Sequence, residues 1–203
     1  MVETMKAIET VYRGINFRSR NEARWAVFMD QLGIPFEYEP EGFELNGLRY
    51  LPDFYLTDQK IWAEVKSQLP NETEKEKAVR LVNESGLALV FLIFSHGRAE
   101  SIEHSGGPFY PPSSKDRHPQ LAVWQNCIGC KAFSVGPYAP AAGFECWNCG
   151  LKLTSEQVLE LADKGQEVFD ETILADAFTV ARQARFEFGE TPHGLPPVDR
   201  EGV

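Results

Sequence analysis

The sequence predicts an α/β fold, because segments with helical periodicity alternate with short runs of strand-forming residues. A charged helix over 20–32 is expected first, and extended segments rich in aromatic residues follow it. These segments, interpreted as neighbouring strands, are 36–38, 48–56 and 61–66. A second charged helix over 71–85 leads into the apolar run 87–94, whose length suits a buried strand.

Capping residues indicate where both helices begin or end. Ser19 and Glu22 have the spacing of a capping box, which predicts the start of the first helix, and Gly33 with Pro35 ends it. Gly86 follows the second helix directly, at a position where glycine often ends a helix. The expected order of elements is therefore helix, strands, helix, strand.

The rest of the chain predicts further modules around this core. A segment rich in glycine, proline and serine is expected to be a linker, since it lacks any sustained period. Four cysteines follow, and then two helical segments, Thr154 to Lys164 and Asp170 to Phe186. The predicted division is a core over 1–100, a linker over 101–120, a zinc ribbon over 121–153 and a helical C-terminal tail over 154–203.

Composition excludes several classes of protein. The 203 residues are 43% hydrophobic and 25% charged, as in ordinary globular proteins. No apolar run approaches the roughly twenty residues of a membrane span, and no signal-peptide pattern opens the chain. We therefore expect a cytoplasmic protein without membrane contact, in the host cytoplasm if a phage encodes it. The chain lacks a phosphate-binding Gly-Lys-Ser/Thr loop and a nucleophile elbow, which disfavours an ATPase or a serine hydrolase.

Two carboxylates and a lysine carry the main functional prediction. A symmetric turn at 58–59 between the last two predicted strands places Asp53 directly opposite Glu64. Facing carboxylates repel each other unless a cation lies between them, and a hard divalent ion such as magnesium suits this pair. Alternation along the strand places Lys66 on the face of Glu64, where an ammonium can orient an attacking water. The open alternative is an edge hairpin with solvated charges.

The same residues resemble the motif of the PD-(D/E)XK nuclease superfamily. Pro52-Asp53 and Glu64-Val65-Lys66 match that motif, and over roughly residues 12–95 the element order is similar to that of the family. The resemblance implies a restriction endonuclease-like mixed sheet flanked by helices. It also implies that Asp53 and Glu64 bind Mg²⁺ or Mn²⁺, with the Val65 carbonyl completing the metal shell. Lys66 would act on the nucleophilic water, and DNA would be left with a 5′-phosphate.

Glu22 has two open interpretations. As the third residue after Ser19 it suits a capping box, whereas several members of the superfamily use a glutamate of the first helix in the active site. Arg18, Arg20 and Arg24 are expected to surround the entrance of the site and to contact DNA phosphates, with solvated helix charges as the alternative. Aromatic residues of this region are assigned to the core; they are Trp25, Phe28, Tyr50, Phe54, Tyr55 and Trp62.

All four cysteines belong to two CxxC pairs separated by fifteen residues; they are Cys127, Cys130, Cys146 and Cys149. This spacing is typical of a tetrahedral four-thiolate zinc site, and a closed shell of four thiolates indicates a structural ion. Whether such a ribbon also binds DNA or a protein partner is a hypothesis that the sequence leaves open.

The sequence therefore predicts a magnesium-dependent DNA nuclease that uses metal-activated water, acting on branched or phage DNA, alone or as a homodimer. RNA stays open as a substrate. A protein partner at the ribbon or the C-terminal helices is a further hypothesis. The alternative function is a non-catalytic nuclease-like module that binds DNA or protein. The formal charge of -10 favours this alternative, since phosphate binding relies on lysine and arginine.

Overall fold

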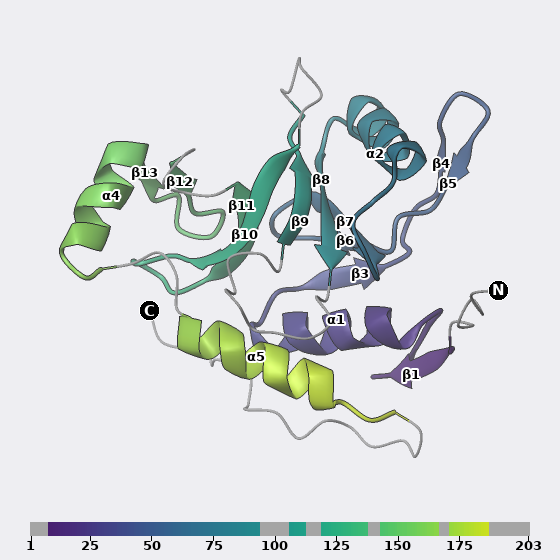
Figure 1. Ribbon diagram of the computed structural model, residues 1–203, viewed down its shortest axis with the longest axis horizontal. Coiled ribbons are helices and arrows are strands. Elements are labelled where there is room, and N and C mark those ends of the chain that lie inside the picture. Colours follow the sequence, from purple (N-terminus) through teal and green to yellow (C-terminus); the bar gives the residue numbers. More distant parts are fainter. Residues whose placement is uncertain (1–7, 94–105, 113–118, 138–142, 167–170, 187–203) are drawn as a thin grey trace.

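The computed structural model describes residues 8–93, 106–112, 119–137, 143–166 and 171–186. Its centre is a seven-stranded sheet with the order β11-β10-β9-β8-β7-β6-β3 (Figure 1). The strands are β3 Phe36–Tyr38, β6 Phe54–Leu56, β7 Ile61–Lys66, β8 Ala88–Ile93, β9 Gly106–Tyr110, β10 Gln120–Asn126 and β11 Phe133–Pro137. β7 and β8 run parallel and all other neighbours run antiparallel, so the fold is a mixed α/β fold.

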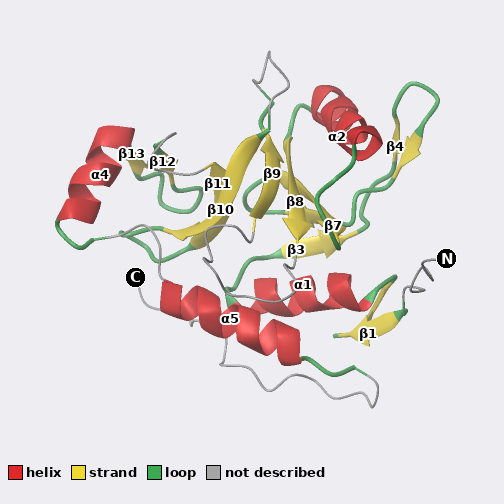
Figure 2. Ribbon diagram, in the orientation of Figure 1, coloured by secondary structure: helices red, strands yellow, loops and turns green. Residues whose placement is uncertain are grey.

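Helices cover both faces of this sheet (Figure 2). α1 (Arg20–Gln31) and α5 (Glu171–Gln183) lie side by side on one face, and α2 (Glu72–Ser85) lies on the other. α2 also forms the crossover connection that the parallel pair of β7 and β8 requires. The result is a three-layer arrangement with the sheet in the middle.

The side chains of β8 alternate between the two helical layers. Val90 and Leu92 pack with α1 and α5, whereas Leu89 and Phe91 pack with α2. Because both faces of this strand are buried, its sequence is continuously apolar. The two apolar clusters meet at this strand and hold the neighbouring β7 in place.

Several local predictions for this part of the chain are confirmed. Ser19 caps α1 and accepts a hydrogen bond from the Glu22 amide. Asn71 and Glu74 form a complete capping box at the start of α2, and Gly86 ends that helix with a left-handed φ of 67°. The predicted strands 36–38, 61–66 and 87–94 correspond to β3, β7 and β8.

Three two-stranded sheets lie beside the main sheet within the described residues. They pair β1 (Thr10–Tyr12) with β2 (Ile15–Phe17), β4 (Phe43–Glu44) with β5 (Arg49–Tyr50), and β12 (Phe144–Glu145) with β13 (Lys152–Leu153). The predicted strand 48–56 is therefore divided, because β5 takes its first half and β6 its second. Pro52 lies between them and has no amide hydrogen for a ladder, so Asp53 lies just outside β6.

The prediction of a structureless linker over 101–120 is wrong for β9, which lies inside it. β9 pairs with β8 on one side and with β10 on the other, so the main sheet continues across the predicted boundary. Gly107 permits this close pairing, since a Cβ atom there would lie 2.6 Å from the carbonyl oxygen of Phe91. Glycine is typical of loops, so the glycines that this strand needs made its sequence resemble a linker.

The C-terminal helices pack onto the rest of the protein, which the description of 154–203 as a tail does not anticipate. α4 (Ser155–Asp163) packs against the cysteine-bearing segment through Val158. α5 joins the main core, where the Phe178 ring lies 4.2 Å from Phe28 and 5.8 Å from Trp25, measured between ring centroids. Residues 187–203 lie outside the described residues.

We predict that Phe178→Ala lowers the free energy of unfolding by about 3–5 kcal/mol, because the ring fills buried space between α5 and α1. Denaturant unfolding followed by tryptophan fluorescence measures this change. Thr179→Ala, on the exposed side of the same helix, should change stability by less than about 0.5 kcal/mol. Equally small effects of both substitutions would mean that α5 does not pack on α1.

Candidate functional site

The hairpin of β6 and β7 has the predicted register. Phe54 faces Ala63 at the end of the ladder, and one further pair in the same register places Asp53 opposite Glu64. The two acids are 5% and 9% exposed. They lie close enough for the charge of Glu64 to act on the pKa of Asp53.

Asp53 is held by two donors. Its Oδ2 accepts a hydrogen bond of 2.7 Å from the Val65 amide, and its Oδ1 pairs with the Arg18 guanidinium at 2.8 Å. Burial, followed by the charge of Glu64, raises the pKa of Asp53 well above its ordinary value, although Val65 and Arg18 act in the opposite direction. The two donors therefore compensate only part of the cost of ionising Asp53.

Lys66 lies on the same face of β7 as Glu64, as the alternation along the strand predicts. Its ammonium nitrogen is 3.1 Å from Glu64 Oε1 and 2.9 Å from Glu74 Oε1. Burial lowers the pKa of Lys66, but the two glutamates raise it by more, so the net shift is upward. Lys66 is therefore protonated at neutral pH and can act as a cation or as a hydrogen-bond donor.

The second carboxylate oxygen of Glu64, Oε2, is buried near the Tyr50 hydroxyl. Within the part of the chain that the structure describes, Glu64 Oε2 has no hydrogen-bond partner. An unpartnered buried carboxylate oxygen costs free energy, which a bound cation would offset. Burial, then the charge of Glu64 and the approach of the Tyr50 hydroxyl to its carboxylate, raise the pKa of Tyr50 well above its ordinary value, so Tyr50 is a potential donor to Glu64.

Val65 contributes its backbone to the site. The amide and carbonyl of a strand residue point to the same side, and the Val65 amide points to Asp53, so the Val65 carbonyl points to the same side of β7 as Asp53. The residue opposite Val65 in this register is Pro52, which has no amide hydrogen and cannot pair with that carbonyl. Carboxylate and carbonyl oxygens such as these are the atom types that magnesium prefers as ligands, and magnesium binding here stays a prediction.

Glu22 caps α1 in a way that differs from the predicted capping box. Its carboxylate accepts a hydrogen bond of 3.0 Å from the Arg18 amide instead of the Ser19 amide. It also accepts hydrogen bonds of 2.6 Å from the Ser19 hydroxyl and from the Tyr38 hydroxyl. Glu22 is buried, and its charge contributes to the raised pKa of Asp53. Glu22 thus lies both at the cap and beside the site, and its participation in metal binding stays a prediction.

The three arginines expected at one entrance lie in two places. Arg18 lies among the acids, where it pairs with Asp53 and with Glu39. Arg20 and Arg24 line a different cavity, which they share with the end of α5. Their position departs from the expected arrangement because α1 turns their side chains away from the face that carries Glu22.

Sequence reasoning misses Tyr38 and Glu74, which both contact predicted site residues. Glu74 has two roles, since its Oε2 accepts the Asn71 amide at 2.8 Å while its Oε1 pairs with Lys66. The capping position of Glu74 can be read from the sequence as the third residue after Asn71. Its contact with Lys66 depends on how α2 packs on the sheet, which no local pattern shows.

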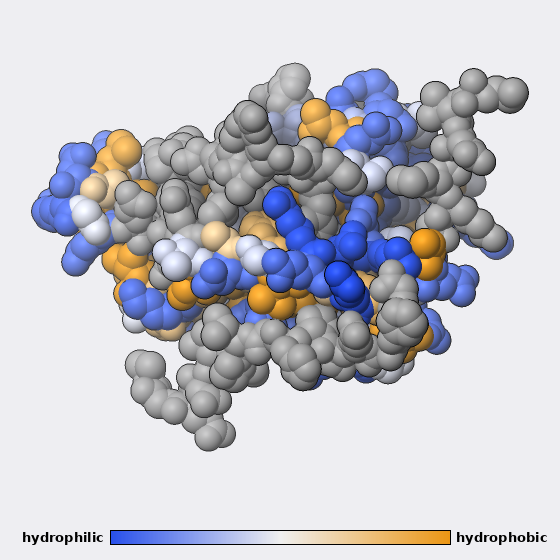
Figure 3. All heavy atoms as spheres, turned by 60° about the horizontal axis from the view of Figure 1, so that its bottom comes forward, coloured by the Kyte–Doolittle hydropathy of each residue, from blue (hydrophilic) through white to orange (hydrophobic). Residues whose placement is uncertain are grey.

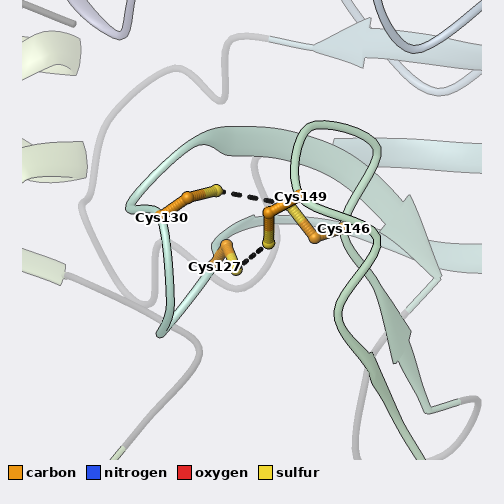
Figure 4. Close-up of side chains that lie close together, drawn as sticks. All are labelled: Cys127, Cys130, Cys146 and Cys149. Atoms are coloured by element: carbon orange, nitrogen blue, oxygen red, sulfur yellow. Dashed lines mark hydrogen bonds between the residues drawn. The ribbon is translucent and has the colours of Figure 1, made fainter. Parts of the chain in front are cut away.

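The four cysteines come together from two turns (Figure 4). Cys127 and Cys130 lie between β10 and β11, and Cys146 and Cys149 lie between β12 and β13. All four sulfur atoms lie within 4.8 Å of one another, and the closest pairs are 3.5 and 3.6 Å apart. Around a tetrahedral zinc ion with Zn–S distances of about 2.3 Å, the sulfur atoms are about 3.8 Å apart. The cluster could therefore hold a metal such as zinc.

The two cysteine turns repeat one backbone geometry. In each turn, the carbonyl of the first cysteine accepts a hydrogen bond from the amide four residues later. The amide of the same cysteine donates a hydrogen bond to the carbonyl five residues later. Lys131 and Gly150 occupy equivalent positions with left-handed φ values of 62° and 73°. Burial raises the pKa of Cys130, but hydrogen bonds from the Ala132 amide and the Asn148 side chain outweigh burial and lower it to about 6. Both turns therefore direct donors at sulfur, as in zinc knuckles.

The apolar cluster around the cysteines is small. Phe144 and Val158 pack there with two of the cysteines. Trp124 and Phe133 lie next to the first cysteine turn in the sequence, yet they belong to the main core, where Trp124 stacks on Trp25 at 6.0 Å between ring centroids. The cysteine cluster is therefore attached directly to the main sheet, at the end away from β6 and β7 (Figure 1).

Comparison of the chain with protein-family models, with curated proteins and with solved structures finds no match. In the described part of the chain, no helix has both the length and the apolar character needed to span a bilayer.

We predict that the purified protein contains about one zinc ion per chain and that Cys146→Ser abolishes its binding. Losing a structural zinc should lower the Tm markedly, since zinc binding contributes about 10–16 kcal/mol in zinc-finger peptides. Elemental analysis and thermal unfolding measure both effects. Lys131→Gly is the control, because it leaves the four sulfurs and relieves a left-handed non-glycine residue. Retention of the wild-type Tm by a zinc-free Cys146→Ser protein would contradict a structural role.

We predict that Asp53→Asn raises the Tm in magnesium-free buffer, and more at pH 8 than at pH 5. The folded state raises the pKa of Asp53, so ionised Asp53 costs stability above that pKa, and the cost disappears as pH falls toward the ordinary value. Each kcal/mol relieved should raise the Tm by about 2–4 °C. A lower Tm at pH 8 would mean that Arg18 and Val65 already stabilise the carboxylate fully.

We predict that added magnesium reverses the order of the Tm values of wild type and Asp53→Asn. At a hundredfold excess over Kd, a bound ion stabilises the folded state by about 2.7 kcal/mol, so the wild-type Tm should rise by about 5–10 °C. The Tm of Asp53→Asn should stay nearly constant, whereas Asp163→Asn, an exposed change in α4, should respond like wild type. Equal responses of all three proteins would place the magnesium elsewhere.

Proposed function

We propose that this protein is a magnesium-dependent nuclease that hydrolyses DNA phosphodiester bonds at the site of Asp53, Glu64 and Lys66. The observation that carries the proposal is the pair of buried carboxylates, Asp53 and Glu64, which face each other on one hairpin. Arg18 and Lys66 each pair with one of these acids, yet the pKa of Asp53 stays raised, so a divalent cation between the two carboxylates would offset the remaining cost. A function that uses such a cation explains why they are there.

The residues present fit a hard divalent cation. Asp53, Glu64 and the Val65 carbonyl offer oxygen atoms, and magnesium is typically held by few protein oxygens together with water and substrate phosphate. When bound, the ion would polarise the phosphodiester and make a water molecule more acidic. Arg18 would have to share or release Asp53 Oδ1, to which it now donates.

Lys66 has the charge and the position to assist hydrolysis. Its ammonium is fixed between Glu64 and Glu74, so its direction is set before substrate arrives. From there it can donate a hydrogen bond to the attacking water or to a phosphate oxygen that gains negative charge. Its raised pKa keeps it protonated for this role.

The resemblance of Pro52-Asp53 and Glu64-Val65-Lys66 to the PD-(D/E)XK motif supports the same reaction. A restriction endonuclease-like fold belongs to this proposal. Zinc at the four cysteines belongs to it as a structural ion, and four reduced cysteines suit a reducing compartment such as the cytoplasm.

The second candidate is a non-catalytic module that binds DNA or protein. The ion pairs of Arg18 with Asp53 and of Lys66 with Glu74 favour it, because they occupy groups that catalysis would use. The net charge of -10 is the other observation in its favour.

We predict that the protein cleaves at least one member of a labelled panel of linear, single-stranded and branched DNA and of RNA, when Mg²⁺ or Mn²⁺ is added. Asp53→Asn and Lys66→Ala should each slow cleavage by roughly a hundredfold or more. Lys164→Ala is the matched control, because it removes a lysine that pairs with a glutamate in α4 at 2.7 Å. Its rate should equal that of wild type.

The panel also separates the two candidates. Cleavage that survives in Asp53→Asn and Lys66→Ala would come from another site or from a contaminant, and the proposal would be wrong. A folded, zinc-containing wild type that binds DNA and cleaves none of the panel would favour the binding module.

A further inference from the structure

We infer that a four-arginine groove between α1 and α5 binds the phosphate backbone of the nucleic acid. This groove is a cavity of about 750 Å³. Its basic residues are Arg20, Arg24, Arg182 and Arg185. Figure 3 shows the side of the molecule that carries these helices, with strongly hydrophilic side chains gathered across its middle. The inference rests on the proposed function for the identity of the polyanion.

The fold brings these arginines together from opposite ends of the sequence. Arg20 and Arg24 are one turn apart in the first part of α1, whereas Arg182 lies in the last turn of α5 and Arg185 just beyond its end. The two helices run antiparallel, since Phe178 packs on Phe28 further along α1 while the later residues of α5 reach Arg20. The positive end of α1 therefore lies beside the arginines of α5.

The groove concentrates positive charge in a protein whose net charge is -10. Among the described residues, no carboxylate forms an ion pair with Arg24, Arg182 or Arg185, and the buried Arg24 Nε has no hydrogen-bond partner. Gathered guanidinium groups repel one another unless an anion lies between them. A bound anion would therefore remove repulsion and satisfy a buried donor at once.

A chain of phosphates fits the groove better than a small apolar ligand or a single anion. Binding cavities for small molecules are lined mostly by apolar side chains, whereas this one is lined mostly by arginine and glutamine. Guanidinium groups form paired hydrogen bonds to phosphate oxygens, and four of them on two helices match a ligand with repeated charges.

The groove is connected to the acidic site through the segment that begins α1. Arg18 pairs with Asp53, and Arg20, two residues later, already lines the groove. Glu22 points to the opposite side of α1, so a nucleic acid strand that reaches both places passes the start of this helix. A helix is about 10–12 Å wide, which corresponds to roughly three or four nucleotides at about 3.4 Å each.

Nucleic acid binding, measured separately from cleavage, tests the inference. Fluorescence anisotropy with labelled DNA, without added magnesium and without a chelator that would strip zinc, compares wild type with Arg182→Gln/Arg185→Gln. Both side chains are exposed, so the double substitution should leave the fold intact. We expect at least a tenfold loss of affinity. The slope of log K against log salt should shrink by about 1.4–1.8, since each lost phosphate contact removes about 0.7–0.9.

Arg49→Gln/Lys164→Gln is the matched control, because it removes two positive charges from side chains that are 96% and 61% exposed and lie outside the groove. It should bind DNA within about twofold of wild type. Wild-type affinity and salt slope in the groove variant would overturn the inference, and so would equal losses in both variants. If the groove variant kept its DNA affinity and lost affinity for labelled polyglutamate, the groove would serve an acidic protein segment and the inference would be wrong.

The same measurements separate this inference from the proposed reaction. Selective loss of binding in the groove variant, together with a wild type that binds but does not cleave, would support the groove and count only against hydrolysis. Cleavage that is unaffected in the groove variant at low DNA concentration would count only against the groove.

Discussion

The hydrogen bond from the Val65 amide to Asp53 Oδ2 closes the open end of the β6–β7 hairpin, and the acidic site depends on it. The backbone ladder ends at the pair of Phe54 and Ala63, and beyond it the Asp53 carboxylate accepts the Val65 amide in place of a backbone carbonyl. Because side chains alternate along a strand, a shift of one residue would send Glu64 and Lys66 to the opposite face. One register therefore positions two acids, a carbonyl and an ammonium together.

This placement gathers charge where water is scarce, and the fold offsets the cost elsewhere. Arg18 and Lys66 each approach one acid, and Glu74 holds Lys66 from α2. The compensation is incomplete, because the pKa of Asp53 stays raised. Apolar packing on both faces of β8 stabilises the strand beside the site, so the sheet can carry a locally unfavourable group of charges.

The main sheet is also what relates the separate parts of the chain. β9 and β10 extend it from the acidic site toward the cysteine turns, so the two sites are attached to one sheet. α5 returns from the far end of the sequence to pack beside α1, and its Phe178 occupies the same core as Trp25. The arginine groove exists only because of that return.

The sequence by itself determined the features that depend on near neighbours. Ser19, Asn71 and Gly86 mark helix ends because capping acts within a few residues, and the Asp53–Glu64 pairing follows from a short turn and a period of two. The CxxC spacing likewise carries its own chemistry, since each pair bends around one turn.

Only the tertiary structure decided which distant segments meet. β9 is a strand because it pairs with β8 and β10, and it needs Gly107 because Phe91 leaves no room there for a side chain. Glu74 reaches Lys66 because α2 packs on one face of the sheet. Arg182 joins Arg20 through helix packing between opposite ends of the chain. Local patterns cannot show these contacts, because each depends on how whole elements pack and not on the spacing of residues along the chain.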